Sequence, residues 1–178
     1  MVNLPDVAPV LTTRNLHLRA PEASDASTLL AIINQPDILY ALNRREPRTM
    51  ENVEKFLYNV PRGIALGIHY AFAIELAVTA EVIGLVELHD LNALAASGEI
   101  TIWISADHRR HGFARETMAP VLEWGIHTLH LRKVVGVAKI SNEASIRLMG
   151  AVGMIDQGVQ DASTSEGPTR ARVFSYPD

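Results

Sequence analysis

The sequence contains no cysteine among its 178 residues, and this absence removes several kinds of chemistry. Without cysteine the chain cannot form a disulfide framework, a cysteine zinc site or a thiol nucleophile. Positive charge is also scarce, since the formal net charge is −4. We therefore expect no nucleic-acid partner, because nonspecific binding to nucleic acid requires a basic field.

Long apolar runs are absent as well. No uninterrupted apolar stretch is long enough to span a bilayer, and Met1–Pro9 has no basic start followed by an apolar run. We therefore expect no membrane partner, no signal peptide and a cytoplasmic location. With 48% hydrophobic and 20% charged residues, the chain should fold as an ordinary globule. No repeat or linker is evident, so we predict a single domain over residues 1–178, with residues 1–10 as a flexible N-terminal arm.

Hydrophobic periodicity and helix breakers predict the order of the elements. Pro36 is expected to end the first helix, Pro61 and Gly63 the second, and Pro120 lies inside the third and should kink it. The resulting order of strands and helices indicates an α+β fold, with a mixed sheet covered by helices. We expect strands at 16–20, 70–76, 82–88, 99–104, 134–138, 155–161 and 172–176, and helices at 25–35, 49–61, 112–129 and 142–153.

The segment Arg109–Ala114, with the sequence Arg-Arg-His-Gly-Phe-Ala, follows a predicted strand and opens a long helix. A helix start presents unpaired N–H groups and the positive end of the helix dipole, which together bind phosphate. Gly112 allows close approach of an anion because it has no Cβ. The segment suits a pyrophosphate; alternatively, its basic residues only solvate a helix end. The positive charge comes from Arg109, Arg110, His111 and Arg115.

Two better-known phosphate loops do not fit this segment. A nucleotide triphosphatase loop would end in Gly-Lys-Ser or Gly-Lys-Thr, and a dinucleotide-binding loop would carry three glycines in a first strand–helix unit. Both patterns are absent.

A second segment, Asn142-x-x-Ser145-x-x-Leu148-Met149-x-x-x-Gly153-Met154, follows the predicted strand 134–138. Asn142 is a good helix N-cap, and serine is common in a first helical turn. Taken alone, each residue is explained by its place in the helix.

Together and in this order, the two segments resemble the GCN5-related N-acetyltransferase (GNAT) superfamily. The first matches its Gln/Arg-x-x-Gly-x-Gly/Ala pyrophosphate signature, and the second its Asn-x-x-Ala/Ser…Gly-Phe segment. Leu11–Arg19, Ile83–Val86 and Glu99–Ile104 are similar to three strands of the branch that contains ribosomal-protein alanine N-acetyltransferases. The resemblance covers nearly the whole chain. It implies a GNAT-type mixed, mostly antiparallel sheet with splayed central strands and helices on both faces.

The resemblance implies acetyl-CoA as the co-substrate. The pantetheine arm would lie between the splayed strands, the pyrophosphate would sit on the N–H groups from Arg110 through Arg115, and Asn142 would hold the pantetheine or the splayed strand. No metal is expected, since none of the seven histidines forms a zinc-protease signature. The implied CoA-binding residues are Ile102, Trp103, Ile104, Arg109, Arg110, His111, Gly112, Phe113, Ala114, Arg115 and Asn142.

The implied reaction is direct attack of a neutral amine on the thioester in a ternary complex, driven largely by positioning. Glu99 matches a strand glutamate that often serves as the base in this branch, and Glu87 is the second candidate. For Glu99, a solvated strand-start carboxylate is the alternative. The tyrosine that usually protonates the leaving thiolate is replaced by Met149, which cannot donate a proton. Ser145 is therefore the predicted hydrogen-bond donor to sulfur.

The sequence does not identify the acceptor. Resemblance to the ribosomal-protein branch favours a protein or peptide N-terminal amine, and a small-molecule amine such as an antibiotic or polyamine is the alternative. Met149 also leaves open a non-catalytic acyl-CoA-binding module, and a nucleotide-binding structural domain is a third class. A homodimer is a further option, since it is common in the family.

Overall fold

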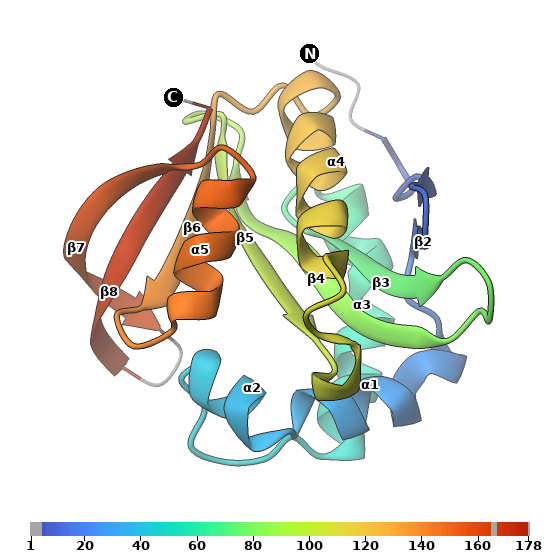
Figure 1. Ribbon diagram of the computed structural model, residues 1–178. Helices are drawn as coiled ribbons and strands as arrows, with labels where there is room; N and C mark the ends of the chain where they lie inside the picture. Colours follow the sequence, from blue (N-terminus) through green and yellow to red (C-terminus); the bar gives the residue numbers. More distant parts are fainter. Residues whose placement is uncertain (1–4, 165–166, 178) are drawn as a thin grey trace.

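The computed structural model describes residues 5–164 and 167–177. One sheet of eight strands runs through it in the order β1-β2-β3-β4-β5-β6-β8-β7 (Figure 1). Neighbouring strands are antiparallel except β5 and β6, which are parallel. The strands are β1 (Leu11–Thr12), β2 (Leu16–Arg19), β3 (Tyr70–Leu76), β4 (Val82–Asn92), β5 (Ser97–Ile104), β6 (Lys133–Lys139), β7 (Ile155–Thr164) and β8 (Gly167–Tyr176).

Helices cover both faces of this sheet, and each face has its own apolar core. The larger core includes Phe72 and Leu88 of the sheet with Leu122 of α4. The smaller core joins Leu85 and Trp103 of the sheet to α1, α2 and α3. None of the helices in the described part of the chain is long and apolar enough to cross a membrane. The helices are α1 (Ala26–Ile33), α2 (Pro36–Ala41), α3 (Met50–Ala65), α4 (Phe113–His127) and α5 (Glu143–Ala151), with 3-10 turns η1 (Ala23–Asp25) and η2 (Ala106–His108).

This architecture confirms the α+β fold and the helices on both faces, but one helix was missed and one expected helix end is wrong. The first helix does end before Pro36, yet Pro36 is also the first residue of a further helix, α2, that was not expected; proline tolerates this position since its missing N–H would be unpaired there anyway. Helix α3 does not stop at Pro61 and Gly63 but continues to Ala65. Its apolar face packs on both sides of the proline, since Val60 before it and Ile64 after it are both buried.

Other boundaries differ less. The connection between the expected strands 82–88 and 99–104 is shorter than predicted, because β4 extends to Asn92 and β5 begins at Ser97. Helix α4 runs through Pro120 without interruption. Strands β7 and β8 remain paired as far as Thr164 and Gly167. Within the expected N-terminal arm, the Pro5 carbonyl accepts a 3.1 Å hydrogen bond from the Tyr70 hydroxyl, and residues 1–4 lie outside the described residues.

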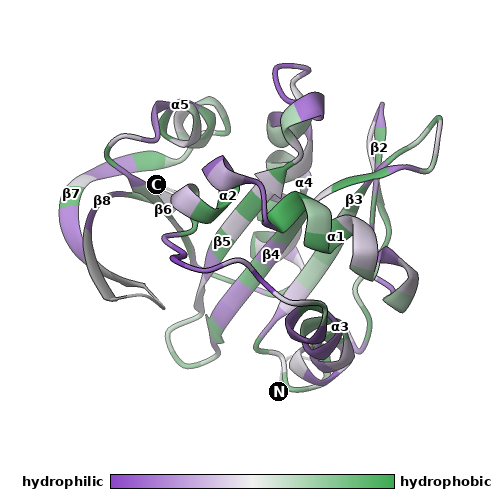
Figure 2. Ribbon diagram, turned by 90° about the horizontal axis from the view of Figure 1, so that it is seen from below, coloured by the Kyte–Doolittle hydropathy of each residue, from purple (hydrophilic) through white to green (hydrophobic). Residues whose placement is uncertain are grey.

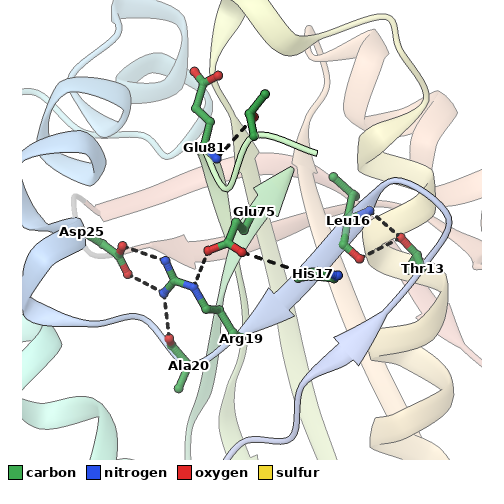
Figure 3. Close-up of polar contacts among 9 residues, drawn as sticks. Thr13, Leu16, His17, Arg19, Ala20, Asp25, Glu75 and Glu81 are labelled. Atoms are coloured by element: carbon green, nitrogen blue, oxygen red, sulfur yellow. Dashed lines mark hydrogen bonds and ion pairs between the residues drawn. The ribbon is translucent and has the colours of Figure 1, made fainter. Parts of the chain in front are cut away.

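A partly buried ion-pair network attaches the start of α1 to strands β2 and β3 (Figure 3). Arg19 of β2 donates to both carboxylate oxygens of Asp25, at 2.8 and 2.9 Å, and to Glu75 of β3 at 2.6 Å. Burial alone would raise the pKa of Asp25, but hydrogen bonds from Arg19 and from the Glu22 N–H outweigh it, so the pKa lies below its usual value. The network fixes where α1 begins over the smaller core.

Candidate active site

Strands β5 and β6 pair along only part of their length and then separate, as Figure 1 shows. Their register runs from Ser97 opposite Lys133 to Ile100 opposite Gly136. Beyond Ile100, β6 continues beside β8 only. The end of β5, Thr101–Ile104, is therefore left without a strand neighbour on that side in the described chain, which confirms the splayed central strands.

Backbone N–H groups of β5 point into this gap. The Ser105 N–H donates to the Ile83 carbonyl at 2.8 Å, so the antiparallel ladder directs alternate residues of β5 toward β4. The N–H groups of Ile102 and Ile104 accordingly point away from β4, toward the gap. An extended ligand arm lying in the gap can pair with them, and buried N–H groups normally have such partners.

The start of α4 lies just beyond β5 and has the conformation of an anion site. Gly112 is the N-cap at φ 83° with no side-chain cap, and Arg110 is also left-handed at φ 66°. Left-handed residues of this kind gather successive N–H groups into a concave nest. Helix bonding begins with the Glu116 N–H to the Gly112 carbonyl, so the N–H groups of residues 113–115 are available to an anion. Three exposed side chains surround them: Arg110, His111 and Arg115.

Arg109 has a different position from its neighbours. Its Nε donates to the Ile104 carbonyl at 2.9 Å, and its guanidinium forms an ion pair with Asp37 of α2. Burial lowers the pKa of Arg109. Its side chain therefore connects the end of β5 to α2, and the remaining basic residues of the segment are exposed next to the start of α4.

Helix α2 crosses the open end of the gap, as Figure 2 shows from below. At its start, Gln35 accepts a 2.9 Å hydrogen bond from the Ala106 N–H beyond β5. At its end, the Tyr40 hydroxyl lies 2.9 Å from the Ser141 hydroxyl, and Lys139 lies 4.0 Å from the Tyr40 ring. The two separated strands are thus joined again through α2. This bridge was not predicted from the sequence, because Pro36 was interpreted only as the end of the first helix.

On the β6 side of the gap, Asn142 caps α5. Its side chain accepts a 3.1 Å hydrogen bond from the Ser145 N–H, while the partly buried Ser145 hydroxyl has no protein partner among residues 5–164 and 167–177. Met149 is a core residue that is 4% exposed. A Cβ on Gly136 would lie 3.0 Å from the Met149 sulfur, so the methionine fills the space under β6.

On the sheet face that carries the smaller core, Glu87 lies in a column of cross-strand pairs that is apolar at one end and polar beyond it. Cross-strand pairs place Leu85 beside Trp103, Glu87 beside Thr101 and His89 beside Glu99. A cavity of about 380 Å³ lies over this column, lined by Leu85, Glu87 and Trp103 from the sheet and by residues of α1, α3 and the segment 42–49. The Glu87 carboxylate lies 2.9 Å from the Nε2 atom of His69, a residue that sequence reasoning did not select.

The two predicted base candidates differ in their surroundings. Glu87 is partly buried and lines the cavity, whereas Glu99 is exposed, lies outside the cavity lining and sits where β5 is still paired with β6. Near Glu99, the His89 ring lies 2.8 Å from both Asp90 and Thr101 through its two nitrogens. His89, Asp90 and Glu99 have ligand atoms within 4.8 Å of one another, and both nitrogens of His89 make hydrogen bonds within the protein.

Comparison with known proteins gives consistent matches over most of the chain. Residues 15–155 match the sequence profile of the acetyltransferase (GNAT) domain. An uncharacterised N-acetyltransferase of Bacillus subtilis is 32% identical over 157 residues, covering 85% of either chain. A spermidine N-acetyltransferase from Vibrio cholerae, solved with CoA and spermine, has a TM-score of 0.78 at 25% identity, covering 92% of this chain and 95% of that one.

A further solved structure is more distant in sequence. It is a ribosomal L7/L12 alpha-N-protein acetyltransferase in complex with coenzyme A, with a TM-score of 0.82 at 13% identity, covering 93% of this chain and 96% of that one. At this identity the likeness establishes the fold alone.

Proposed function

This chain belongs to the GNAT acetyltransferase family and is an acetyl-CoA-dependent N-acetyltransferase, and we propose that the amine it acetylates binds in the cavity beside Glu87. One observation carries the proposal. Trp103 lines the cavity on one side of the sheet, and the same stretch of β5 presents its free edge to the gap between β5 and β6. An acetyl group delivered through the gap would therefore meet an amine held in the cavity.

The donor binds along β5 and at the start of α4 in this proposal. The pantetheine amides pair with the N–H groups of Ile102 and Ile104, and the pyrophosphate lies on the N–H groups of residues 113–115. The helix dipole and the exposed basic side chains favour the negative charge there. The Ile104 N–H also lies where an oxyanion could be stabilised as the thioester carbonyl is attacked.

Glu87 is the proposed base. The amine nitrogen attacks the thioester carbon, the carbon–sulfur bond breaks, and the ammonium proton passes to the Glu87 carboxylate directly or through water. His69 hydrogen-bonds that carboxylate and can hold it toward the cavity. Glu99 is the weaker candidate, because it lies outside the cavity lining and beside the paired part of β5.

Ser145 is the proposed hydrogen-bond donor to the departing thiolate. Its backbone is fixed by Asn142, and its hydroxyl is uncommitted within the described chain. Met149 cannot take this role, because it is buried and has no proton to give.

A thiol-release assay with acetyl-CoA and a panel of amines and N-terminal peptides tests the proposal. We expect acceptor-dependent release of CoA, with the acetyl group recovered on nitrogen. Tight CoA binding without release for any acceptor would instead support the non-catalytic acyl-CoA-binding module.

A further inference from the structure

The cavity beside Glu87 has an unequal charge balance. Three cationic side chains line it, and Glu87 is the one carboxylate among its described lining residues. The rest of the lining is apolar or amide, and it includes Phe56 of α3 and Trp103 of β5. The cations are Arg44 and Arg48, from the segment between α2 and α3, and Lys55 of α3. The end of the cavity away from the sheet is thus basic in a chain whose net charge is −4.

Arg48 is held in place by a specific contact with the end of α1. The Asn34 side chain donates to the Arg48 carbonyl at 2.8 Å and accepts from the Arg48 N–H at 2.7 Å. Asn34 thus hydrogen-bonds both backbone polar groups of Arg48. These two bonds fix the backbone of Arg48, whose side chain lines the cavity.

Neither Arg48 nor Lys55 has a carboxylate within ion-pair distance in the part of the chain that the structure describes. Glu51 and Glu54 share a neighbouring hollow with Lys55, so Lys55 is partly balanced by nearby acids. Arg48 is partly buried, and a guanidinium at the edge of an apolar cavity favours an anionic partner that it can bind through two hydrogen bonds.

We propose that the acceptor is an anionic amine, in which a carboxylate lies close to the amino group that is acetylated. This inference rests on the proposed function, because it concerns the same cavity. The amine faces Glu87 and the thioester at the sheet, and the carboxylate faces Arg48 and its cationic neighbours at the other end. A cavity of about 380 Å³ suits a small molecule or the first residues of a peptide.

The same charges oppose a polyamine. Spermidine carries further ammonium groups, which would be placed beside the cations of the lining, and such like-charge contacts are costly. The likeness to a spermidine acetyltransferase therefore need not extend to the substrate.

Matched acceptor pairs test the proposal with the full-length protein. L-leucine and L-leucinamide differ only in the carboxylate, and the amidated peptides Ala-Asp-Phe and Ala-Asn-Phe differ only in the side-chain charge. Thiol release is measured for both pairs and for spermidine, with rates expressed per unprotonated amine so that differences in amine basicity cancel. We expect kcat/KM to be about tenfold higher for the carboxylate member of at least one pair. The pair that shows the preference then tells whether the acceptor is a free amino acid or a peptide.

Arg48→Gln provides the second arm, and Arg45→Gln is its matched control. Arg45 is exposed on the same segment and does not line the cavity. Arg48→Gln should lower kcat/KM for the preferred carboxylate acceptor about tenfold, mainly through KM, and should lower the value for its neutral partner far less. Arg45→Gln should match the unmodified protein, and thermal melts show that both variants are folded.

The outcomes separate this inference from the proposed function. Three outcomes would overturn the anionic acceptor while leaving the proposed acetyltransferase function in place. They are turnover without a preference for the carboxylate members, a preference for spermidine, and an equal loss of kcat/KM on both members of a pair in Arg48→Gln. A folded, CoA-binding protein that releases no thiol with any acceptor would overturn both.

Discussion

The Nε2 atom of His69 lies 2.9 Å from the Glu87 carboxylate. His69 directly precedes β3, and Glu87 lies in the neighbouring strand β4. The His69 ring also packs against Phe56, with the ring centroids 5.8 Å apart. These contacts connect the carboxylate to Phe56, which also lines the cavity. His69 thus acts on the reaction through the orientation of Glu87, as a positioning residue.

Replacing His69 should therefore change kcat more than it changes substrate binding. For His69→Ala we expect kcat to fall roughly tenfold to a hundredfold while KM for acetyl-CoA changes little. His69→Gln should retain more activity, because its amide can still donate to Glu87. Steady-state kinetics checks this, with His127→Ala on the exposed end of α4 as the control. A loss of melting temperature with unchanged kcat would mean that the pair is only structural.

Ser145→Ala should slow the departure of the thiolate without weakening the binding of acetyl-CoA. Since Asn142 holds the backbone N–H of residue 145, the helix cap survives the substitution. We expect kcat to fall about tenfold with little change in CoA affinity. The comparison variant is Ser24→Ala, on the exposed turn η1. Unchanged turnover at saturating substrates would eliminate Ser145 as the donor to sulfur.

Two glycines with the same backbone conformation give a matched test of the anion site. Gly112 and Gly158 both have φ of 83°, and a Cβ at either position would meet no atom within 4 Å. Alanine at either should therefore cost about 1 kcal/mol of stability through backbone strain alone. Only Gly112→Ala should also weaken CoA binding, because its Cβ lies at the anion site.

Calorimetric titration with CoA measures this difference, and thermal melts measure the stability of both variants. Equal CoA affinity in the two variants would show that the start of α4 does not hold the pyrophosphate.

Acid should destabilise the fold through two carboxylates. The pKa of Asp25 is lowered as described above, and that of Glu116 is lowered because hydrogen bonds from Asn15 and Thr13 outweigh burial, which alone would raise it. A carboxylate whose pKa is depressed by folding contributes stability above its unfolded value of about 4, and that contribution is lost as pH falls through the folded value. Unfolding free energy should thus fall steadily below about pH 5.

Asp25→Asn should remove part of this dependence. We expect the free energy of unfolding to fall by about 2 kcal/mol at pH 7 and to decline less steeply toward low pH. Urea titrations at a series of pH values measure this. An identical pH profile in the unmodified protein and the variant would mean that the Arg19–Asp25 pair contributes nothing to acid stability.

The parts of the site that depend on local signals could be predicted from the sequence. The glycine turn at Gly112 and the cap at Asn142 follow from the residues themselves, and the structure has both. Helix α2 was missed because proline at a helix start and proline at a helix end look alike in sequence. The extension of α3 past Pro61 depends on packing against the sheet, which periodicity alone does not weigh.

The cavity and its charged residues depend on tertiary contacts. His69 and Glu87 are 18 residues apart, and Arg48 is held by Asn34, 14 residues away. A strand resemblance favoured Glu99 over Glu87 in the sequence. The sheet register places both on the same face, and what separates them is their distance along the strands, since Glu87 lines the cavity and Glu99 does not. The cytoplasmic location and the homodimer remain predictions.

The most direct measurement is the rate of acceptor-dependent thiol release in Glu87→Gln and Glu99→Gln, compared with the unmodified protein. Both substitutions remove one negative charge and keep the size of the side chain, and CoA binding by each variant shows that the donor site is intact. We expect a loss of roughly a hundredfold in kcat for Glu87→Gln and a rate within about twofold of the unmodified protein for Glu99→Gln. A large loss in Glu99→Gln with near-normal turnover in Glu87→Gln would rule out Glu87 as the base.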